Sequence, residues 1–511
     1  MADNQTETIA FLSSPDSFGA PDPVDRVETH GAFVFLCGDT ALKLKRAVIY
    51  DYMDLSTPDK RRAMLMRELE LNRPAAPTLY RDVVAVTREA DGRLALDGAG
   101  DPVDWVLRMR RFPAEDELEA VAARGGLDDV LATELGHSLA AYHHAAPVRL
   151  RDGTRLIADI LDELDRVFAG FPGTEALRLH RGWSAGARNA LDRHADLLKA
   201  RGQTGAVRRG HGDLHLRNLV LLDGRPVPFD ALEFDETLGT CDLLYDLAFL
   251  LMDLCHRDLR RAAARVLDAW LLDFQGRQDA GLAALPLFLS VRAAIRAMVL
   301  LQTDAARGMP HASDAEVALL LQEATGFLRP PPPVCIAVGG FSGTGKSLLA
   351  RGLAPHVGAA PGAVWLASDV LRKAGRDNTA PLPDAAYSAT ARGQVYERMM
   401  ARAGTILGAG HTVILDATFL DPTRRTAARD MATALDVPFV GLWLTAPPDR
   451  LRQRVAGRRG DASDADVAVL ERQLAAGSGT VDWRHLDATC DAGATLSAAR
   501  AALADATPAG A

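Results

Sequence analysis

Residues 340–347 constrain the fold of this chain more than any other segment. They read Gly-Phe-Ser-Gly-Thr-Gly-Lys-Ser and fit the pattern G-x-x-x-x-G-K-[ST] at every specified position. The apolar, β-branched residues 334–338 come directly before, and leucine and alanine at helical spacing follow. This order predicts a buried strand, a tight loop and a helix. Glycines allow such a loop to point successive backbone N–H groups at a phosphate, at the positive end of the helix.

The loop therefore predicts a site for a nucleoside triphosphate, with ATP as the expected nucleotide. We expect Lys346 to reach the β- and γ-phosphates and the Ser347 hydroxyl to hold Mg²⁺. The backbone of the remaining loop residues would line the phosphates: Gly340, Ser342, Gly343, Thr344 and Gly345. A chance glycine-rich turn would not need a strand and a helix on its two sides.

The remainder of the chain has the composition of an ordinary globular protein. Its 511 residues are too many for one core and predict two or three domains. A net charge of −9 argues against nonspecific nucleic-acid binding as the main role. The five cysteines are scattered and form no CxxC pair, which is typical of reduced thiols in a cytoplasmic protein. The polar start is no signal peptide, and the most apolar stretch, residues 243–254, contains two aspartates and is too short to cross a membrane.

Four consecutive prolines, residues 330–333, give the clearest domain boundary because they cannot continue a helix. A second change lies near residues 109–113, where short strand-like runs give way to a helical pattern. We therefore predict a loosely ordered segment 1–24, a domain 25–328 with a small lobe to about 110 and a helical lobe from 111, a proline linker 329–333, a second domain 334–504 and a tail 505–511.

A first chemical motif lies in the helical lobe, at residues 211–218, which read His-Gly-Asp-Leu-His-Leu-Arg-Asn. Asp213 and Asn218 lie five apart, and Asp230 follows after two apolar runs separated by Asp-Gly, which is a strong hairpin signal. The hairpin would bring Asn218 and Asp230 to the same end of its strands, where their oxygens suit Mg²⁺. This pattern is used in phosphoryl transfer, with Asp213 orienting the acceptor hydroxyl.

The segment from His211 to Ala248 resembles the catalytic core of the aminoglycoside phosphotransferase family, which is related to the protein kinases. The resemblance implies that Asp213 is catalytic, that Asn218 and Asp230 are metal ligands, and that Asp246 braces the loop. It also implies a phosphate lysine at Lys43 with a glutamate partner on the next helix, and an adenine hinge in residues 105–110 that includes Met109. Glu68 is our choice for the partner, with Glu70 as the alternative.

Some of these residues have other interpretations. Lys45 could be the phosphate lysine instead of Lys43, although a solvated strand position is the simpler interpretation. His211 and His215 could bind a metal, but no third ligand is near in the sequence, and His211 more simply braces the loop. Glu233 and Asp235 follow Asp230 closely and could add to the metal site, but they are more simply interpreted as hydrogen-bond acceptors or surface charges. No G-x-G-x-x-G precedes Lys43, which departs from the protein-kinase pattern.

After residues 340–347, two apolar runs end in Asp369 and Asp416, as parallel strands do when they deliver carboxylates to one edge of an α/β sheet. This half resembles the P-loop kinases of small molecules and polynucleotides, including gluconate kinase and the zeta toxins. The resemblance implies that Asp369 is the general base, that Arg372 anchors the acceptor and that Asp416 supports Mg²⁺. Arg454 and Arg458 would be lid arginines that stabilise the transferred phosphoryl group. A helix N-cap for Asp369 and a solvated helix face for the arginines are the alternatives.

The expected fold is therefore an N-terminal, two-lobed protein-kinase-like α+β domain followed by an α/β P-loop domain with a parallel sheet flanked by helices. The expected function is a bifunctional phosphotransferase that moves the γ-phosphoryl group of ATP to hydroxyl groups of small molecules at two Mg²⁺-dependent sites. Three alternatives remain open: one active kinase with the other domain as a nucleotide-dependent regulator, a C-terminal zeta-like or polynucleotide kinase, and an N-terminal scaffold that binds ATP without transfer. The sequence identifies neither acceptor, nor the oligomeric state.

Overall fold

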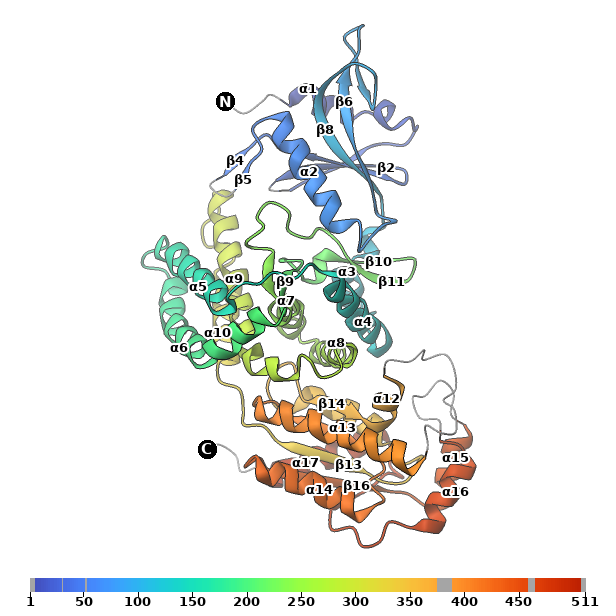
Figure 1. The fold of residues 1–511 in the computed structure, drawn as a ribbon. Coiled ribbons are helices and arrows are strands. Elements are labelled where there is room, and N and C mark those ends of the chain that lie inside the picture. Colours follow the sequence, from blue (N-terminus) through green and yellow to red (C-terminus); the bar gives the residue numbers. More distant parts are fainter. Residues whose placement is uncertain (1–4, 30, 51–52, 375–387, 458–464, 507–511) are drawn as a thin grey trace. The chain divides into compact units, whose positions relative to one another are not determined.

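The computed structural model describes residues 5–29, 31–50, 53–374, 388–457 and 465–506 (Figure 1). The chain divides into two compact units. Unit 1 comprises Met1–Leu131, Ala141–Arg151 and Gly202–Leu247, and unit 2 comprises Ala132–Ala140, Asp152–Arg201 and Ala248–Ala511. Helices α4 (Asp129–Ala145) and α7 (Leu243–His256) contribute residues to both.

Unit 1 begins with helix α1 (Thr6–Leu12) and a 3-10 turn, η1 (Pro15–Phe18), and an antiparallel sheet follows. The described strands of this sheet follow the order β1-β2-β3-β8-β6-β7. Phe35, Leu42 and Val106 from three of these strands are fully buried in one apolar cluster on the sheet. Strand β3 alternates between this cluster and the opposite face, so that Lys43 and Lys45 lie on the same side of the strand. The bounds are β1 Asp25–Glu28, β2 Ala32–Cys37, β3 Thr40–Lys45, β6 Tyr80–Arg88, β7 Leu94–Leu96 and β8 Asp101–Arg110.

One helix, α2 (Pro58–Asn72), follows β3 and packs on β6 and β8. Thr57 caps its first turn by accepting the N–H of Lys60, and Pro58 occupies the first helical position, where no N–H is needed. Its buried face carries both Leu65 and Glu68. The helix therefore brings one carboxylate into the interior beside the sheet.

The rest of unit 1 carries the predicted hairpin. Strands β10 (Leu219–Leu222) and β11 (Arg225–Pro228) pair in register, and Asp223 and Gly224 between them have φ of 51° and 80°, as a type I′ turn requires. The predicted hairpin is confirmed. Phe229 donates its N–H to the Asn218 carbonyl over 3.0 Å, so the hairpin is closed at the end that carries Asn218 and Asp230. A second pair, β9 (Val207–Arg209) with β12 (Thr240–Asp242), lies on either side of this segment in the sequence.

Unit 2 contains a helical region followed by a second sheet. Its helices are α5 Gly153–Ala169, α6 Glu175–Gln203, α8 Arg260–Asp273, α9 Leu285–Ala306 and α10 Asp314–Phe327, with a 3-10 turn, η4, at Asp279–Ala284. Among the described residues, one stretch, Asp279–Ala306, is long and apolar enough to cross a membrane, and 67% of its apolar window is buried inside the protein. That burial is typical of a core helix in a soluble protein. The stretch lies outside residues 243–254, which the composition suggested as the most apolar.

The second sheet is parallel, with the strand order β14-β15-β13-β16-β17 among the described residues. Helices α11 and α17 pack on it through one apolar cluster, and α13 contacts β14 and β15 (Figure 1). The strands are β13 Cys335–Gly339, β14 Val364–Ala367, β15 Val413–Asp416, β16 Phe439–Thr445 and β17 Arg484–Asp487. The helices are α11 Lys346–Leu353, α12 Ser368–Lys373, α13 Ala389–Gly408, α14 Pro422–Ala434, α15 Pro448–Ala456, α16 Val467–Ala476 and α17 Ala492–Ala506.

The fold class expected from the sequence is confirmed. Unit 1 combines an antiparallel sheet and the packed helix α2 with the later β10–β11 hairpin, which is the protein-kinase-like order of elements. The C-terminal part of unit 2 is an α/β domain in which a loop joins the central strand β13 to α11, as in P-loop proteins. The predicted boundary at residues 329–333 lies between α10 and β13, outside any helix or strand.

Candidate active sites

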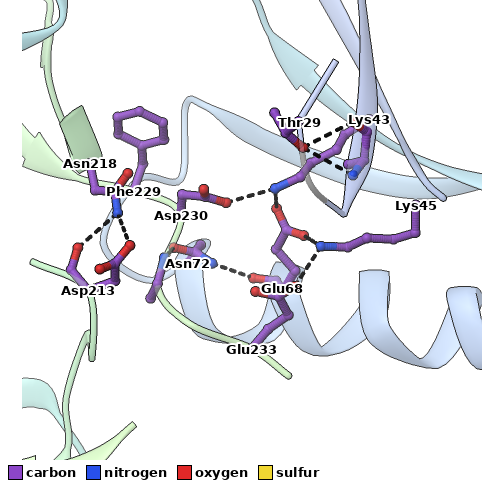
Figure 2. A network of polar contacts seen from close by, with 12 residues as sticks. Thr29, Lys43, Lys45, Glu68, Asn72, Asp213, Asn218, Phe229, Asp230 and Glu233 are labelled. Atoms are coloured by element: carbon purple, nitrogen blue, oxygen red, sulfur yellow. Dashed lines mark hydrogen bonds and ion pairs between the residues drawn. The ribbon is translucent and has the colours of Figure 1, made fainter. Parts of the chain in front are cut away.

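The candidate site of unit 1 is centred on Lys43, which lies between two carboxylates (Figure 2). Its Nζ is 2.6 Å from Glu68 Oε1 and 2.7 Å from Asp230 Oδ1. Burial disfavours the charge of Lys43, but Asp230 and Glu68 outweigh this effect and raise its pKa well above the ordinary value. Glu70, the alternative partner, is exposed and pairs with Arg67 instead.

Lys45 and Glu233 extend this charge network. Lys45 Nζ is 2.7 Å from Glu68 Oε2 and 2.6 Å from Glu233 Oε1, and the residue is only 4% exposed. The interpretation of Lys45 as a solvated strand residue and of Glu233 as a surface charge was wrong. Both were assigned to the surface because isolated charges seldom lie inside proteins. The two lysines on one side of β3 were the signal in the sequence for a shared, buried partner.

The loop that carries Asp213 is held from two sides. Asp246 is fully buried and accepts the backbone N–H groups of His211 and Gly212 over 2.7 and 2.9 Å. His211 Nε2 lies 2.9 Å from the Phe229 carbonyl, which can only accept, so that nitrogen carries the proton. Burial lowers the pKa of His211 and keeps the ring neutral. The hydrogen bonds of Asp246 and His211 therefore brace the loop.

Asn218, which is predicted to be a metal ligand, directly contacts Asp213, the predicted catalytic aspartate. Its Nδ2 donates to the Asp213 carbonyl oxygen over 2.8 Å and to Asp213 Oδ2 over 2.9 Å. Because the amide nitrogen of Asn218 donates these two hydrogen bonds, its amide oxygen is the atom that could bind a cation. Among the described residues, no three His, Cys, Asp or Glu side chains gather as a metal site of their own. Asn218 and Asp230 do supply hard oxygens, which suit a Mg²⁺ ion that takes its other ligands from phosphate and water.

Asp230 itself has an unusual backbone, with φ of 58°. Tyr80 holds this conformation, because its hydroxyl accepts the N–H of Asp230 over 3.0 Å. Asn72 acts in the same way on the next residue, by accepting the N–H of Ala231 over 2.7 Å. Although burial opposes ionisation of Asp230, Lys43 lowers the pKa of this carboxyl. Tyr80 and Asn72 were not identified from the sequence, because both act through the backbone of a distant segment.

In unit 2 the loop after β13 has the backbone that its glycines predict. Gly340 and Gly343 have φ of 139° and 87°, and a Cβ at either position would approach a backbone oxygen to 3.0 Å or less. Lys346 Nζ donates to the Phe341 carbonyl over 3.0 Å, across the loop. Gln473 of α16, which was not identified from the sequence, accepts the N–H of Ser342 over 2.9 Å.

Two carboxylates lie at the carboxyl ends of the neighbouring strands. Asp416 ends β15 and is hydrogen-bonded to Ser347, the loop residue expected to hold Mg²⁺. Burial raises the pKa of Asp416, and Lys346 acts in the opposite direction. Asp369 lies in the first turn of α12, with Ala367 as the N-cap, and forms an ion pair of 2.6 Å with Arg372. A Ser347 hydroxyl beside a buried carboxylate fits a Mg²⁺ site that is completed by phosphate oxygens.

The predicted lid arginines are less well placed by the structure. Arg454 is exposed on α15, and Arg458 lies outside the described residues. Met109 is half-buried in β8, in register with Ala41. Two further arginines of this part of the chain have other contacts. Arg425 is buried and donates to the Phe419, Leu420, Ser478 and Thr480 carbonyls, and Arg424 lies over the Tyr396 ring.

The chain is similar to several known proteins. A sequence-family model described as "AAA domain" matches residues 335–478. The solved structure of a choline/ethanolamine kinase family protein from Mesorhizobium loti is 18% identical to this chain. The match covers 63% of this chain and 94% of the other, with a TM-score of 0.42. A gluconokinase from Sinorhizobium meliloti 1021 is 22% identical and covers 34% of this chain and 93% of its own, with a TM-score of 0.25.

Three mycobacterial relatives match nearly the whole chain. One of them, the "Uncharacterized protein Rv2004c" of Mycobacterium tuberculosis, is 30% identical in an alignment of 489 residues that covers 90% of this chain and 91% of that protein. The chain belongs to the same protein family as Rv2004c.

Proposed function

We propose that this protein is a phosphotransferase with two active sites, each of which moves the γ-phosphoryl group of ATP to a hydroxyl group of a small molecule. The observation that carries the proposal is that one chain holds two separate sets of the groups this reaction needs. Each set has a lysine for phosphate, oxygen ligands for Mg²⁺ and a carboxylate for the acceptor. The two sets share no residue.

At the first site, Asp213 accepts the proton of the acceptor hydroxyl while that oxygen attacks the γ-phosphorus. The bond from the γ-phosphorus to the bridging oxygen breaks, and ADP leaves with its electron pair. Lys43 binds the phosphates and is oriented by Glu68, and Asn218 and Asp230 would hold Mg²⁺. The bound ion would neutralise charge on the phosphate oxygens.

At the second site, Asp369 takes the proton of the acceptor and Arg372 anchors the acceptor. The backbone of residues 340–345 and Lys346 would hold the phosphates, with Ser347 and Asp416 as the side chains for Mg²⁺. Arg454 and Arg458 would close on the transferred phosphoryl group. An arginine in that role contributes about 10³–10⁵-fold to the rate in other phosphotransferases.

Calorimetric titration of the whole protein with MgATP tests whether both sites bind nucleotide. We expect two molecules of ATP per chain for the wild type and one for Lys43→Ala and for Lys346→Ala, because each substitution removes the phosphate lysine of one site. The double variant should bind none. If Lys346→Ala still bound two molecules, the second site would be wrong, and the same result for Lys43→Ala would remove the first.

A further inference from the structure

A tryptophan on the edge strand of the second sheet connects the helical region of unit 2 to the P-loop site. Trp365 lies on β14, in register with Ile414 on β15, so its side chain lies on the face of the sheet that also carries Asp416. Its indole Nε1 donates a hydrogen bond to Asp416 Oδ2 over 3.1 Å. The carboxylate that faces Ser347 is therefore held from its other side by an indole N–H.

The backbone of the same residue is held by the helical region. Within the part of the chain that the structure describes, strand β14 pairs with β15 alone, and the N–H of Trp365 points away from that partner. Asp268 of α8 accepts this N–H over 3.0 Å, with a side chain that is only 8% exposed. Burial is costly for this carboxylate and raises its pKa to about 6. Asp268 thus fixes the free edge of β14 at the residue whose indole reaches Asp416.

Two arginines fix the ring of Trp365. The guanidinium carbon of Arg351, from the P-loop helix α11, lies 4.6 Å from the ring centroid, and that of Arg265, from α8, lies 5.5 Å from it. Arg265 also donates to the Arg351 carbonyl over 3.2 Å. One turn of α8 therefore contacts both the ring and the backbone of Trp365.

A second buried contact joins the same two parts of unit 2. Arg402 of α13 forms two hydrogen bonds of 2.8 Å with Asp279 of η4, and both residues are almost fully buried. Bidentate arginine–carboxylate pairs of this kind fix geometry as well as charge. The helical region and the sheet are therefore held together next to β14.

We propose that Trp365 is a positioning residue that orients Asp416 for Mg²⁺ in the P-loop site, and that Asp268 holds Trp365 from the helical region. The proposal rests on the proposed function of the second site. It makes α8, which is outside the P-loop domain in the sequence, a part of that site. Nucleotide binding alone depends on the loop backbone and Lys346, whereas the gain in affinity from Mg²⁺ depends on Asp416 and hence on Trp365.

The test compares ATP affinity with and without Mg²⁺ by calorimetry, in the full chain carrying Lys43→Ala so that only the second site binds. Trp365→Phe keeps the aromatic ring but removes the N–H. We expect it to keep the affinity measured in EDTA and to reduce the gain in affinity from Mg²⁺ about tenfold, since it removes a hydrogen bond to a charged group. Trp183→Phe is the matched control, because it removes an indole hydrogen bond of 2.7 Å to Ser290, elsewhere in unit 2.

Asp268 is tested by rescue. Asp268→Ala should reduce the gain from Mg²⁺ in the same direction as Trp365→Phe, and Asp268→Asn should restore it, because an amide oxygen also accepts the Trp365 N–H. Equal behaviour of Trp365→Phe and Trp183→Phe would overturn the proposal, as would a loss of affinity in EDTA as large as the loss in Mg²⁺. If Lys346→Ala removed no ATP binding, the proposed function of the second site would be overturned instead.

Discussion

Glu68 is the residue at which the charge network of unit 1 converges, because each of its carboxylate oxygens contacts a different lysine. Glu68 shares Lys43 with Asp230, a group that would bind Mg²⁺, and it shares Lys45 with Glu233. Nucleotide phosphates would compete with the carboxylates for Lys43. Lys45 would then still balance the charges of Glu68 and Glu233. We therefore expect Lys45 to have a structural role beside Lys43, the phosphate-binding lysine.

Substitution of Lys45 by Met should therefore destabilise the protein, because it leaves two buried carboxylates with one cation fewer. We expect a loss of about 3 kcal/mol in the free energy of unfolding, measured by urea denaturation. Lys60→Met is the matched control, because Lys60 forms an exposed ion pair with Asp54, and such pairs contribute about 1 kcal/mol or less. The double variant Lys45→Met/Glu233→Gln should recover part of the loss, and equal stability of Lys45→Met and Lys60→Met would contradict the network.

Asp213 carries the chemical step of the first site in this account. Asp213→Asn keeps the size of the side chain but cannot take a proton, so transfer by this site should fall by about 100-fold or more while ATP affinity stays within about twofold. Steady-state kinetics and calorimetry on the same preparation separate the two effects. Asp223→Asn, in the exposed hairpin turn, is the control. Undiminished turnover in Asp213→Asn would assign the proton transfer to another group.

At this scale the sequence predicts residues that belong to local motifs and misses those that act across the fold. The spacing of Asp213, Asn218 and Asp230 was informative because one hairpin brings them together. Glu233 and Trp365 follow from no local pattern, since a charged residue ordinarily lies outside and a tryptophan in an apolar strand ordinarily belongs to the core. Their contacts depend on which strands and helices become neighbours.

At the scale of elements, helices α7 and α10 of unit 2 are joined by one histidine. His256 Nδ1 lies 2.8 Å from Glu323 and its Nε2 lies 2.7 Å from Glu316. The hydrogen bond to Glu323 has the largest effect on the pKa of His256 and raises it. Burial acts in the opposite direction, and the hydrogen bond to Glu316 raises the pKa further. The net result is a pKa of about 9. Because the folded pKa is raised, the stabilisation is complete below the unfolded pKa near 6.5 and is lost as the pH rises through about 9.

His256→Gln should consequently lower the stability of unit 2 at pH 6 and have almost no effect above pH 9.5. After allowance for solvent around the exposed glutamates, the loss at pH 6 should be on the order of 1 kcal/mol. Thermal unfolding of the wild type and the variant at both pH values measures this difference. His311→Gln serves as control, since His311 pairs with Asp314 at the surface. A difference between wild type and His256→Gln that does not change with pH would exclude the charged histidine.

Elements with a clear local pattern were predicted well. The strand at residues 334–338 is observed as β13, Cys335–Gly339, and the helix expected after the glycine-rich loop is α11, Lys346–Leu353. The order of strands in the two sheets could not be predicted from the sequence, because it depends on pairings between distant segments. The same is true of the attachment of β14 to α8, which one backbone N–H and one buried carboxylate determine.

For the whole molecule, the compact units do not follow the order of the sequence. The four prolines remain a predicted boundary between domains, yet the helices on their N-terminal side belong to the same compact unit as the P-loop sheet. The buried contacts of Asp268 and Asp279 explain this grouping. A helical region that completes one kinase-like fold in the sequence thus also supports the second site.

We propose that one chain transfers phosphate at two independent sites. A direct test supplies ATP labelled at the γ-phosphate, Mg²⁺ and a cytosolic metabolite extract to the wild type, Asp213→Asn and Lys346→Ala, and compares the labelled products. We expect each variant to lose a different product and to keep the other, which would also identify both acceptors. If one variant lost all labelled products and the other lost none, only one site would be catalytic, and the claim of two phosphotransferases would be contradicted.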